Sequence, residues 1–256
     1  MKEWLNIAYG QDSACKLDIY APRNKSGFAT IIWFHGGGLT SGKKEDGKDL
    51  ATDFIKAGYG FVSVDYRMYP NAKFPQYILD CAKAVAYVQR VIGDYGGDGK
   101  SIFISGQSAG AWIALLLCLN QTYLSNEGVN PLDICGWLID SAQTTSHFNI
   151  LKIEQGEDEL SQRINELAPL YYLSKTTSFT KMFLMFYEND MPCRYEQNML
   201  FYKAILAFNK DAAISYKVLK GAHCQGSTKR DEKGEFEYVQ ASLQCLNRWR
   251  EINQDV

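Results

Sequence analysis

The sequence lacks the features that would place the protein in a membrane or on a nucleic acid. Its 256 residues contain no apolar run that approaches the length of a transmembrane helix. Lys and Arg number 27 and Asp and Glu 29, so a net charge of −2 gives no sign of a nucleic-acid or membrane partner. Residues 1–6 have neither an apolar run nor a small-residue cleavage site, so we expect no signal peptide and a cytoplasmic protein.

Paired cysteine motifs, internal repeats and linker-like segments are also missing. The seven cysteines are scattered and none form C-x-x-C, and this odd number predicts free thiols in a reducing compartment. A hydrophobic content of 46% is enough for a large core. We therefore expect residues 1–256 to form a single domain.

A stretch in the middle of the chain, residues 101–117, predicts a strand, a sharp turn and a helix. Its first five residues are mostly apolar, β-branched or aromatic, which is typical of a buried strand, and its last nine are apolar helix formers. Between them lies G-Q-S-A-G, a G-x-S-x-G pattern whose glycines relieve the crowding of a sharp strand-to-helix turn. Five small residues often occur together by chance, but this context favours Ser108 as a nucleophile.

A second pattern, H-G-G-G beginning at His35, follows the apolar run F-A-T-I-I-W-F, which predicts a central strand. Three successive glycines give a flexible backbone whose N–H groups can converge on one point. We expect the N–H groups of Gly37 and Gly38, with that of Ala109 at the start of the later helix, to form an oxyanion hole. A phosphate-binding loop is the alternative, but it would need an immediate helix and a Lys-Ser or Lys-Thr pair. We expect His35 to orient this loop rather than to act as a base.

Candidates for a catalytic acid and base follow two later predicted strands. The run M-F-L-M-F-Y predicts one strand, and Asp190 comes soon after it, with Glu188 as the reserve candidate for the acid. The last predicted strand is followed by His223 in a loop. We expect His147 to be a loop or pocket histidine rather than the base.

Three predictions concern segments outside these motifs. Apolar residues at helical spacing predict a long amphipathic helix over residues 76–91. The irregular segment 141–178 is too short for an independent domain, so we expect a small cap over the site, with a polar helix near Asp158 to Leu167. Asp65, Arg67 and Asp80 are expected to form a buried ion-pair network, because buried charges must be paired.

The chain order Ser108, Asp190, His223 is that of nucleophile, acid and base, and each residue follows the carboxyl end of a predicted strand. Strands and helices alternate, which predicts an α/β fold with a mostly parallel central sheet and helices on both faces. In this arrangement His223 would take the proton of Ser108 and return it to the leaving alcohol, while Asp190 holds the imidazole. We expect neither a metal nor a cofactor.

Together these motifs resemble the esterase/lipase branch of the α/β hydrolases, with its carboxylesterase-like and feruloyl- or acetyl-xylan-esterase-like members. The resemblance runs roughly from Cys15 to the C-terminus and is weaker from Ser141 onward, where Tyr187 stands in place of the glycine of a G-x-x-D pattern. It implies an α/β-hydrolase fold and ester hydrolysis. The matching patterns are H-G-G-G at 35–38, D-Y-R-x-x-P at 65–70, F-P at 74–75, G-G-D at 96–98 and G-Q-S-A-G-A at 106–111.

The motifs and the resemblance lead us to expect a serine hydrolase that cleaves carboxylic esters of small or short-chain acyl groups through an acyl-enzyme. Carbohydrate or plant-derived esters are suggested by the resemblance alone. An amidase of the arylformamidase type, with the same triad, is the alternative. A non-catalytic binding protein of the same fold is a third hypothesis, which the intact triad disfavours. The expected partner is a small-molecule ester substrate.

Overall fold

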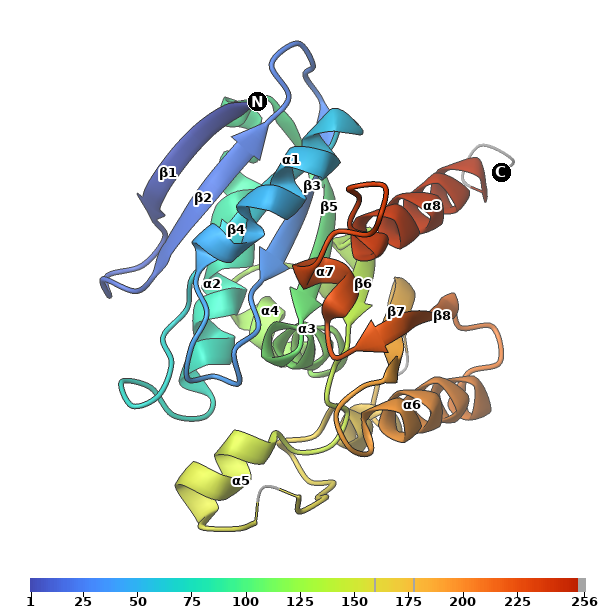
Figure 1. Ribbon diagram of the computed structural model, residues 1–256. Coiled ribbons are helices and arrows are strands. Elements are labelled where there is room, and N and C mark those ends of the chain that lie inside the picture. Colours follow the sequence, from blue (N-terminus) through green and yellow to red (C-terminus); the bar gives the residue numbers. More distant parts are fainter. Residues whose placement is uncertain (159, 177, 253–256) are drawn as a thin grey trace.

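A single mixed sheet organises the chain in the computed structural model, which describes residues 1–158, 160–176 and 178–252 (Figure 1). The strands lie in the order β1-β2-β4-β3-β5-β6-β7-β8, so the first strand of the chain forms one edge of the sheet and the last strand forms the other. Six strands, β3 to β8, run parallel, and only β2 pairs antiparallel with its neighbours β1 and β4. The strand bounds are β1 Lys2–Ala8, β2 Lys16–Ala21, β3 Phe28–Phe34, β4 Gly60–Val64, β5 Gly97–Gln107, β6 Gly136–Asp140, β7 Lys181–Asn189 and β8 Ile214–Ala222.

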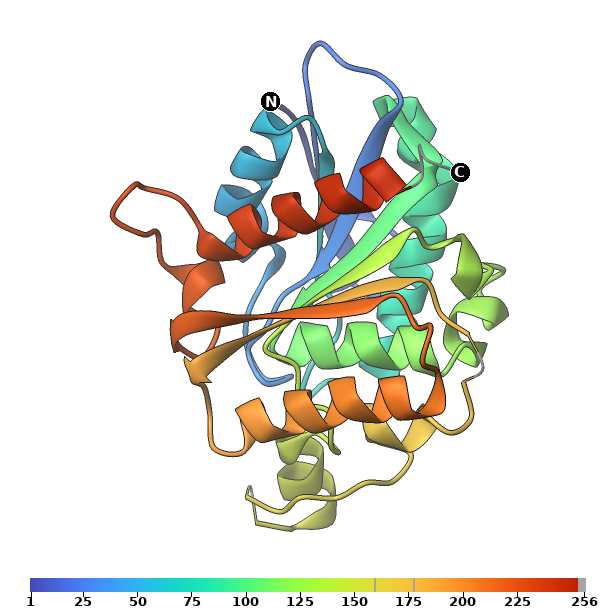
Figure 2. The ribbon, with the colours of Figure 1, turned by 90° about the vertical axis from the view of Figure 1, so that its right-hand side faces the viewer.

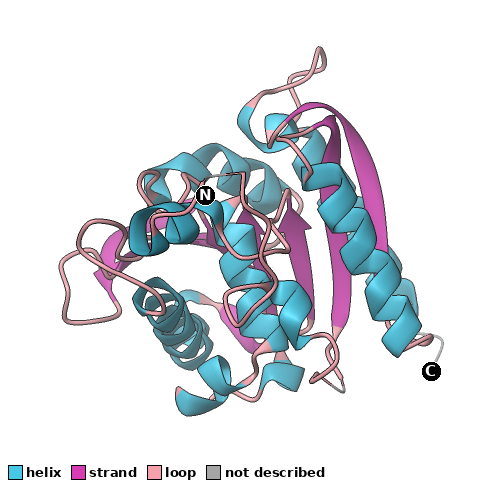
Figure 3. Ribbon diagram, turned by 90° about the horizontal axis from the view of Figure 1, so that it is seen from below, coloured by secondary structure: helices cyan, strands magenta, loops and turns pink. Residues whose placement is uncertain are grey.

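The middle strands are mostly apolar, as expected of strands whose two faces are both covered by helices. Every residue of β4 and of β6 is buried. α1 and α8 pack on one face, and α2, α3 and α6 pack on the other (Figures 2 and 3). The helix bounds are α1 Lys48–Lys56, α2 Gln76–Val91, α3 Ala109–Leu119, α4 Thr122–Asn126, α5 Phe148–Gln155, α6 Arg194–Phe208, α7 Gln225–Thr228 and α8 Glu237–Ile252.

The predicted fold class is confirmed, and several elements begin and end where the sequence predicted them. α2 has the predicted bounds because apolar residues recur at helical spacing on one face of it. α3 is buried at all eleven positions, as expected of a helix made almost entirely of apolar residues. Within the described residues, no helix combines the length and apolarity needed to span a bilayer.

The helix predicted near Asp158 to Leu167 is wrong for the described part of that range, and Glu159 lies outside the described residues. Polar side chains bind the local backbone there instead: the Asp158 carboxylate accepts from the N–H of Leu160 at 2.7 Å, and the Asn165 side chain accepts from the N–H of Leu167 at 3.0 Å. Such bonds compete with helix formation. The helix of this region is α5, which lies earlier in the chain.

The expected ion-pair network is only partly present. The Arg67 guanidinium donates two hydrogen bonds to the buried Asp80 carboxylate, from Nε at 2.8 Å and from Nη2 at 2.7 Å. Asp65 takes no part in this pair, because its carboxylate accepts from the backbone N–H of Lys44 at 2.6 Å. All seven cysteines are free.

Candidate active site

Ser108 lies on the sharp turn between β5 and α3, with a backbone φ of 53° and ψ of −112°. Its N–H donates to the carbonyl oxygen of Asp140 at 2.8 Å, which ties the turn to the end of β6. The flanking glycines are required by close approach. A Cβ at Gly106 would lie 2.3 Å from the carbonyl carbon of Gly110, and one at Gly110 would lie 2.1 Å from the carbonyl oxygen of Phe34. The G-x-S-x-G pattern therefore follows from steric fit.

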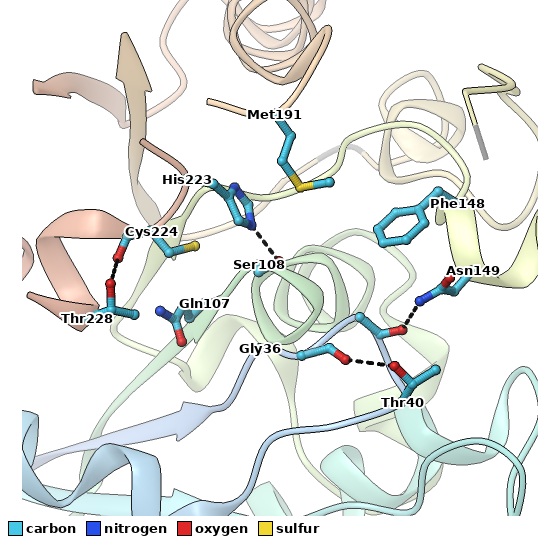
Figure 4. A pocket seen from close by; sticks show the side chains of 12 residues that line it. Gly36, Thr40, Gln107, Ser108, Phe148, Asn149, Met191, His223, Cys224 and Thr228 are labelled. Carbon is cyan, nitrogen blue, oxygen red and sulfur yellow. Dashed lines mark hydrogen bonds between the residues drawn. The ribbon is translucent and has the colours of Figure 1, made fainter. Parts of the chain in front are cut away.

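The loops after β7 and β8 bring an acid and a histidine to this serine. His223 follows β8, and its Nε2 lies 2.8 Å from the Ser108 hydroxyl oxygen (Figure 4). Its Nδ1 is hydrogen-bonded to the Asp190 carboxylate, which follows β7 and is fully buried. Ser108, His223 and Asp190 thus form one continuous chain of hydrogen bonds, although Ser108 and His223 lie 115 positions apart in the sequence and His223 and Asp190 lie 33 apart.

The carboxylate of Asp190 is held ionised by its hydrogen bonds. Burial on its own raises the pKa of this group, but hydrogen bonding to His223 and the charge of that ring, with bonds from Ser141 Oγ and the N–H of Met191, lower it overall. Ser141 follows β6, and its hydroxyl contacts both Asp190 and His223 Nδ1, the latter at 3.1 Å. Sequence reasoning missed Ser141, and its place directly after a strand was the only signal. Glu188, the reserve candidate, is exposed.

The glycine loop after β3 faces the same serine. Gly37 has a φ of 101° and Gly38 one of 63°, both in the left-handed region that favours glycine. Within the described residues, no hydrogen bond uses the N–H of either glycine, whereas their carbonyl oxygens are occupied by Ser41 and Asn149. Ala109 begins α3, where the first N–H groups of a helix have no intrahelical acceptor and favour negative charge. These are the three groups predicted for the oxyanion hole.

His35 orients the loop, as the sequence analysis expected, and does not approach the serine. The buried ring binds the carbonyl oxygen of Gly36 through Nδ1 at 2.7 Å and stacks on Tyr66 at 4.4 Å between ring centroids. The Tyr66 hydroxyl donates to the carbonyl oxygen of His35 at 2.7 Å. Burial lowers the pKa of His35 to about 4, so the ring is neutral near pH 7.

His147, the remaining histidine, caps α5. Its Nδ1 accepts a hydrogen bond from the N–H of Asn149 at 3.3 Å, and its buried ring packs edge-on against Trp112. Burial, and to a lesser degree the charge of Arg194, lowers its pKa to about 3. The next two residues, Phe148 and Asn149, reach the cavity described below.

A cavity of about 480 Å³ opens above Ser108 (Figure 4). Its wall combines the glycine loop and the serine turn with Phe148 and Asn149 of α5 and with Met191 after β7. Sequence reasoning missed Phe148, Asn149 and Met191, because only tertiary packing brings these residues to the serine. Within the described ranges, no group of three or more His, Cys, Asp or Glu side chains is arranged to hold a metal ion.

A solved structure and two curated proteins resemble the chain. Esterase B from Lactobacillus Rhamnosis superposes with a TM-score of 0.82 over 99% of this chain and 86% of its own, at 18% identity. The probable isoprenylcysteine alpha-carbonyl methylesterase ICMEL1 of Oryza sativa subsp. japonica is 33% identical over 147 residues, 57% of this chain and 33% of that protein. Esterase LipQ of Mycobacterium tuberculosis is 37% identical over 91 residues, 35% of this chain and 22% of that protein. The chain thus spans a third or less of the length of these curated relatives.

The parallel sheet, the serine turn after β5 and the superposition define an α/β-hydrolase fold. The model of the BD-FAE family matches residues 17–205, and the chain belongs to this family. Together with the esterase relatives, this match confirms the predicted resemblance to the esterase/lipase branch.

Proposed function

We propose that the protein is a serine esterase that hydrolyses carboxylic esters of small or short-chain acyl groups through an acyl-enzyme. One observation carries the proposal: the hydrogen-bonded chain from Ser108 through His223 to Asp190 ends at a cavity bordered by the glycine loop. An unassisted serine hydroxyl is a weak nucleophile at neutral pH, and this arrangement supplies the base that activates it. The names of the two curated relatives, a methylesterase and an esterase, support the same reaction class.

In the proposed reaction, the Ser108 oxygen attacks the ester carbonyl carbon while His223 Nε2 takes the hydroxyl proton. The tetrahedral intermediate collapses to an acyl-serine, and the same proton passes from His223 to the leaving alkoxide. Water, deprotonated by His223, then attacks the acyl-serine. His223 returns this proton to the Ser108 oxygen as the acid is released, which restores the free enzyme. Asp190 holds the imidazole in the correct tautomer and stabilises the imidazolium that forms twice in the cycle.

The negative charge of each tetrahedral intermediate is assigned to the N–H groups of Gly37, Gly38 and Ala109. Hydrogen bonds to a developing oxyanion are among the largest contributions to ester hydrolysis, and the loss of one donor costs about 3 kcal/mol of transition-state stabilisation. The free N–H groups of the glycine loop support this assignment.

We further propose that residues 141–178 form a small cap within one domain of residues 1–256. α5 supports this role, because the Asn149 side chain donates to the carbonyl oxygen of Gly38 at 2.6 Å and the Glu154 carboxylate accepts from the N–H of Phe74 at 3.0 Å. The cap contributes an apolar ring, Phe148, to a cavity whose modest volume suits short acyl groups.

Hydrolysis of p-nitrophenyl acetate, compared with that of an N-formyl aryl amide, tests the proposal. We expect the ester to be the better substrate and kcat to fall about 10⁶-fold in Ser108→Ala, the order found on removing the serine of a Ser-His-Asp triad. Wild-type protein as slow as Ser108→Ala on both substrates would refute the enzyme assignment, and a preference for the amide would favour the amidase.

The acid and the acyl preference need separate measurements. Asp190→Asn should lower kcat by about 10,000-fold, because the imidazole would adopt the wrong tautomer, whereas Glu188→Gln should leave kcat unchanged. An unaffected Asp190→Asn would contradict the assignment of the acid.

A p-nitrophenyl ester series from acetate to decanoate tests the acyl preference. It should show the highest kcat/KM for the shortest acyl chains.

A further inference from the structure

A second cavity, of about 310 Å³, adjoins the first beneath the cap. Phe148 and Met191 line both cavities, and Figure 4 shows the two side chains bordering the space next to Ser108. The wall of the second cavity also includes Arg194 and three glutamines, and no described residue in it is Asp or Glu. A group attached to a substrate bound at Ser108 would therefore enter a chamber that contains a cation and, among the described residues, no anion.

Arg194 is only 4% exposed, yet it has no carboxylate partner among the described residues. Its Nη1 donates to the carbonyl oxygen of Ser141 at 3.0 Å, and its Nη2 approaches the sulfur of Met191 at 3.9 Å. Its Nε is fully buried and has no hydrogen-bond acceptor within the described part of the chain. A buried guanidinium without a counter-ion is costly, because its desolvation is not repaid.

Neighbouring groups compensate this charge only in part. Arg194 is the first residue of α6, where the helix dipole also favours an anion. Asp190 is the acid whose charge acts on Arg194, but its oxygens already bind His223 and Ser141. The glutamine amides of the wall are occupied locally, as in the bond from Gln197 Nε2 to Gln162 Oε1 at 2.8 Å.

We propose that Arg194 binds a carboxylate carried by the ester substrate, so that the protein prefers monoanionic esters to neutral ones. This inference rests on the proposed esterase function and names its substrate class. The planar guanidinium fork matches a carboxylate, and such charge-assisted pairs are stronger than neutral hydrogen bonds. The ligand carries a single charge because Arg194 is the one cation among the described residues that line the cavity.

Two pairs of probes test the preference and show which half of the ester carries the charge. For the acyl half, mono-p-nitrophenyl adipate is compared with its methyl ester. For the leaving half, p-acetoxybenzoate is compared with its methyl ester. In the pair whose carboxylate reaches Arg194, the anionic ester should have the higher kcat/KM. Arg194→Met should lower the ratio of kcat/KM for the anionic ester to that for the neutral ester by about 10- to 100-fold, which is the effect of losing a hydrogen bond to a charged group.

Matched variants distinguish carboxylate binding by Arg194 from its structural role at the active site. Arg194→Lys keeps the charge without the fork, so it should retain part of the ratio. Lys210→Met removes an exposed positive charge in the loop after α6 and should leave the ratio unchanged. Because Arg194 also holds the carbonyl of Ser141, Arg194→Met can slow both esters of a pair; only the ratio reports carboxylate binding.

Binding without turnover gives a second readout. Monomethyl adipate and p-acetoxybenzoate are titrated calorimetrically into Ser108→Ala, and one of them should bind at least tenfold more tightly than to Ser108→Ala/Arg194→Met. An equal loss of activity on both esters of each pair, with no difference in binding, would overturn the inference and leave the esterase proposal intact. Wild-type protein as inactive as Ser108→Ala on every ester, anionic and neutral, would instead refute the esterase proposal.

Discussion

Replacement of His147 by Asn should make the protein less sensitive to acid. The imidazole is 2% exposed, packs against Trp112 and caps α5 through a bond from the N–H of Asn149. Asn is a good N-cap residue and can accept the same bond, but it does not titrate. His147→Asn therefore removes the titration with little change to the cap.

The sign and size of this pH effect on the free energy of unfolding follow from the lowered pKa of His147. This pKa is about 3 in the folded chain and about 6.5 in the unfolded chain. Between these values the unfolded chain binds a proton that the folded chain excludes. The contribution of His147 to stability is therefore complete above pH 6.5 and decreases as the pH falls toward 3. At pH 4.5 the loss is about 2 to 3 kcal/mol, since each pH unit below 6.5 costs about 1.4 kcal/mol.

Urea unfolding followed by tryptophan fluorescence at pH 7.0 and pH 4.5 measures this loss. Other groups titrate in the same range, His35 among them, but they are common to both proteins and cancel in the difference. The wild-type protein should lose about 2 to 3 kcal/mol more unfolding free energy between the two pH values than His147→Asn does. Equal losses in the two proteins would refute the reasoning.

Three further substitutions test the packing around the site. Gly110→Ala would place a Cβ 2.1 Å from a carbonyl oxygen of β3, so we expect little folded protein by circular dichroism, and a wild-type Tm would contradict the steric argument. Ser141→Ala removes a hydrogen bond to the charged Asp190, which is worth about 1.5 to 3 kcal/mol. We therefore expect kcat/KM to fall roughly 10- to 100-fold with the fold retained, and unchanged kinetics would show that Ser141 does not support Asp190. Arg67→Met leaves the buried Asp80 carboxylate without its ion-pair partner. The free energy of unfolding, measured by urea titration at pH 7, should fall by about 3 to 5 kcal/mol. A loss below about 1 kcal/mol would show that this ion pair does not stabilise the fold.

The sequence predicted most accurately the elements whose physical cause lies in residues close together in the chain. The bounds of α2 follow from a helical repeat of apolar residues, and the turn at Ser108 follows from two glycines at fixed spacing. The prediction was wrong at Asp158 to Leu167, where side-chain bonds to the nearby backbone replaced the helix. α5 was missed because its capping residue is a histidine, which is not among the usual N-cap residues.

By itself, the sequence determined the alternation of strands and helices, the family resemblance, and the positions of Ser108, Asp190 and His223 at strand ends. These properties depend on residues close together in the chain or on an order that one fold requires. Only the tertiary structure revealed the bond from Asn149 to the glycine loop, 111 residues away, and the buried Arg194, which has no carboxylate partner among the described residues. Such features depend on how distant segments pack and on which charges lose their water, and neither is encoded in a local pattern.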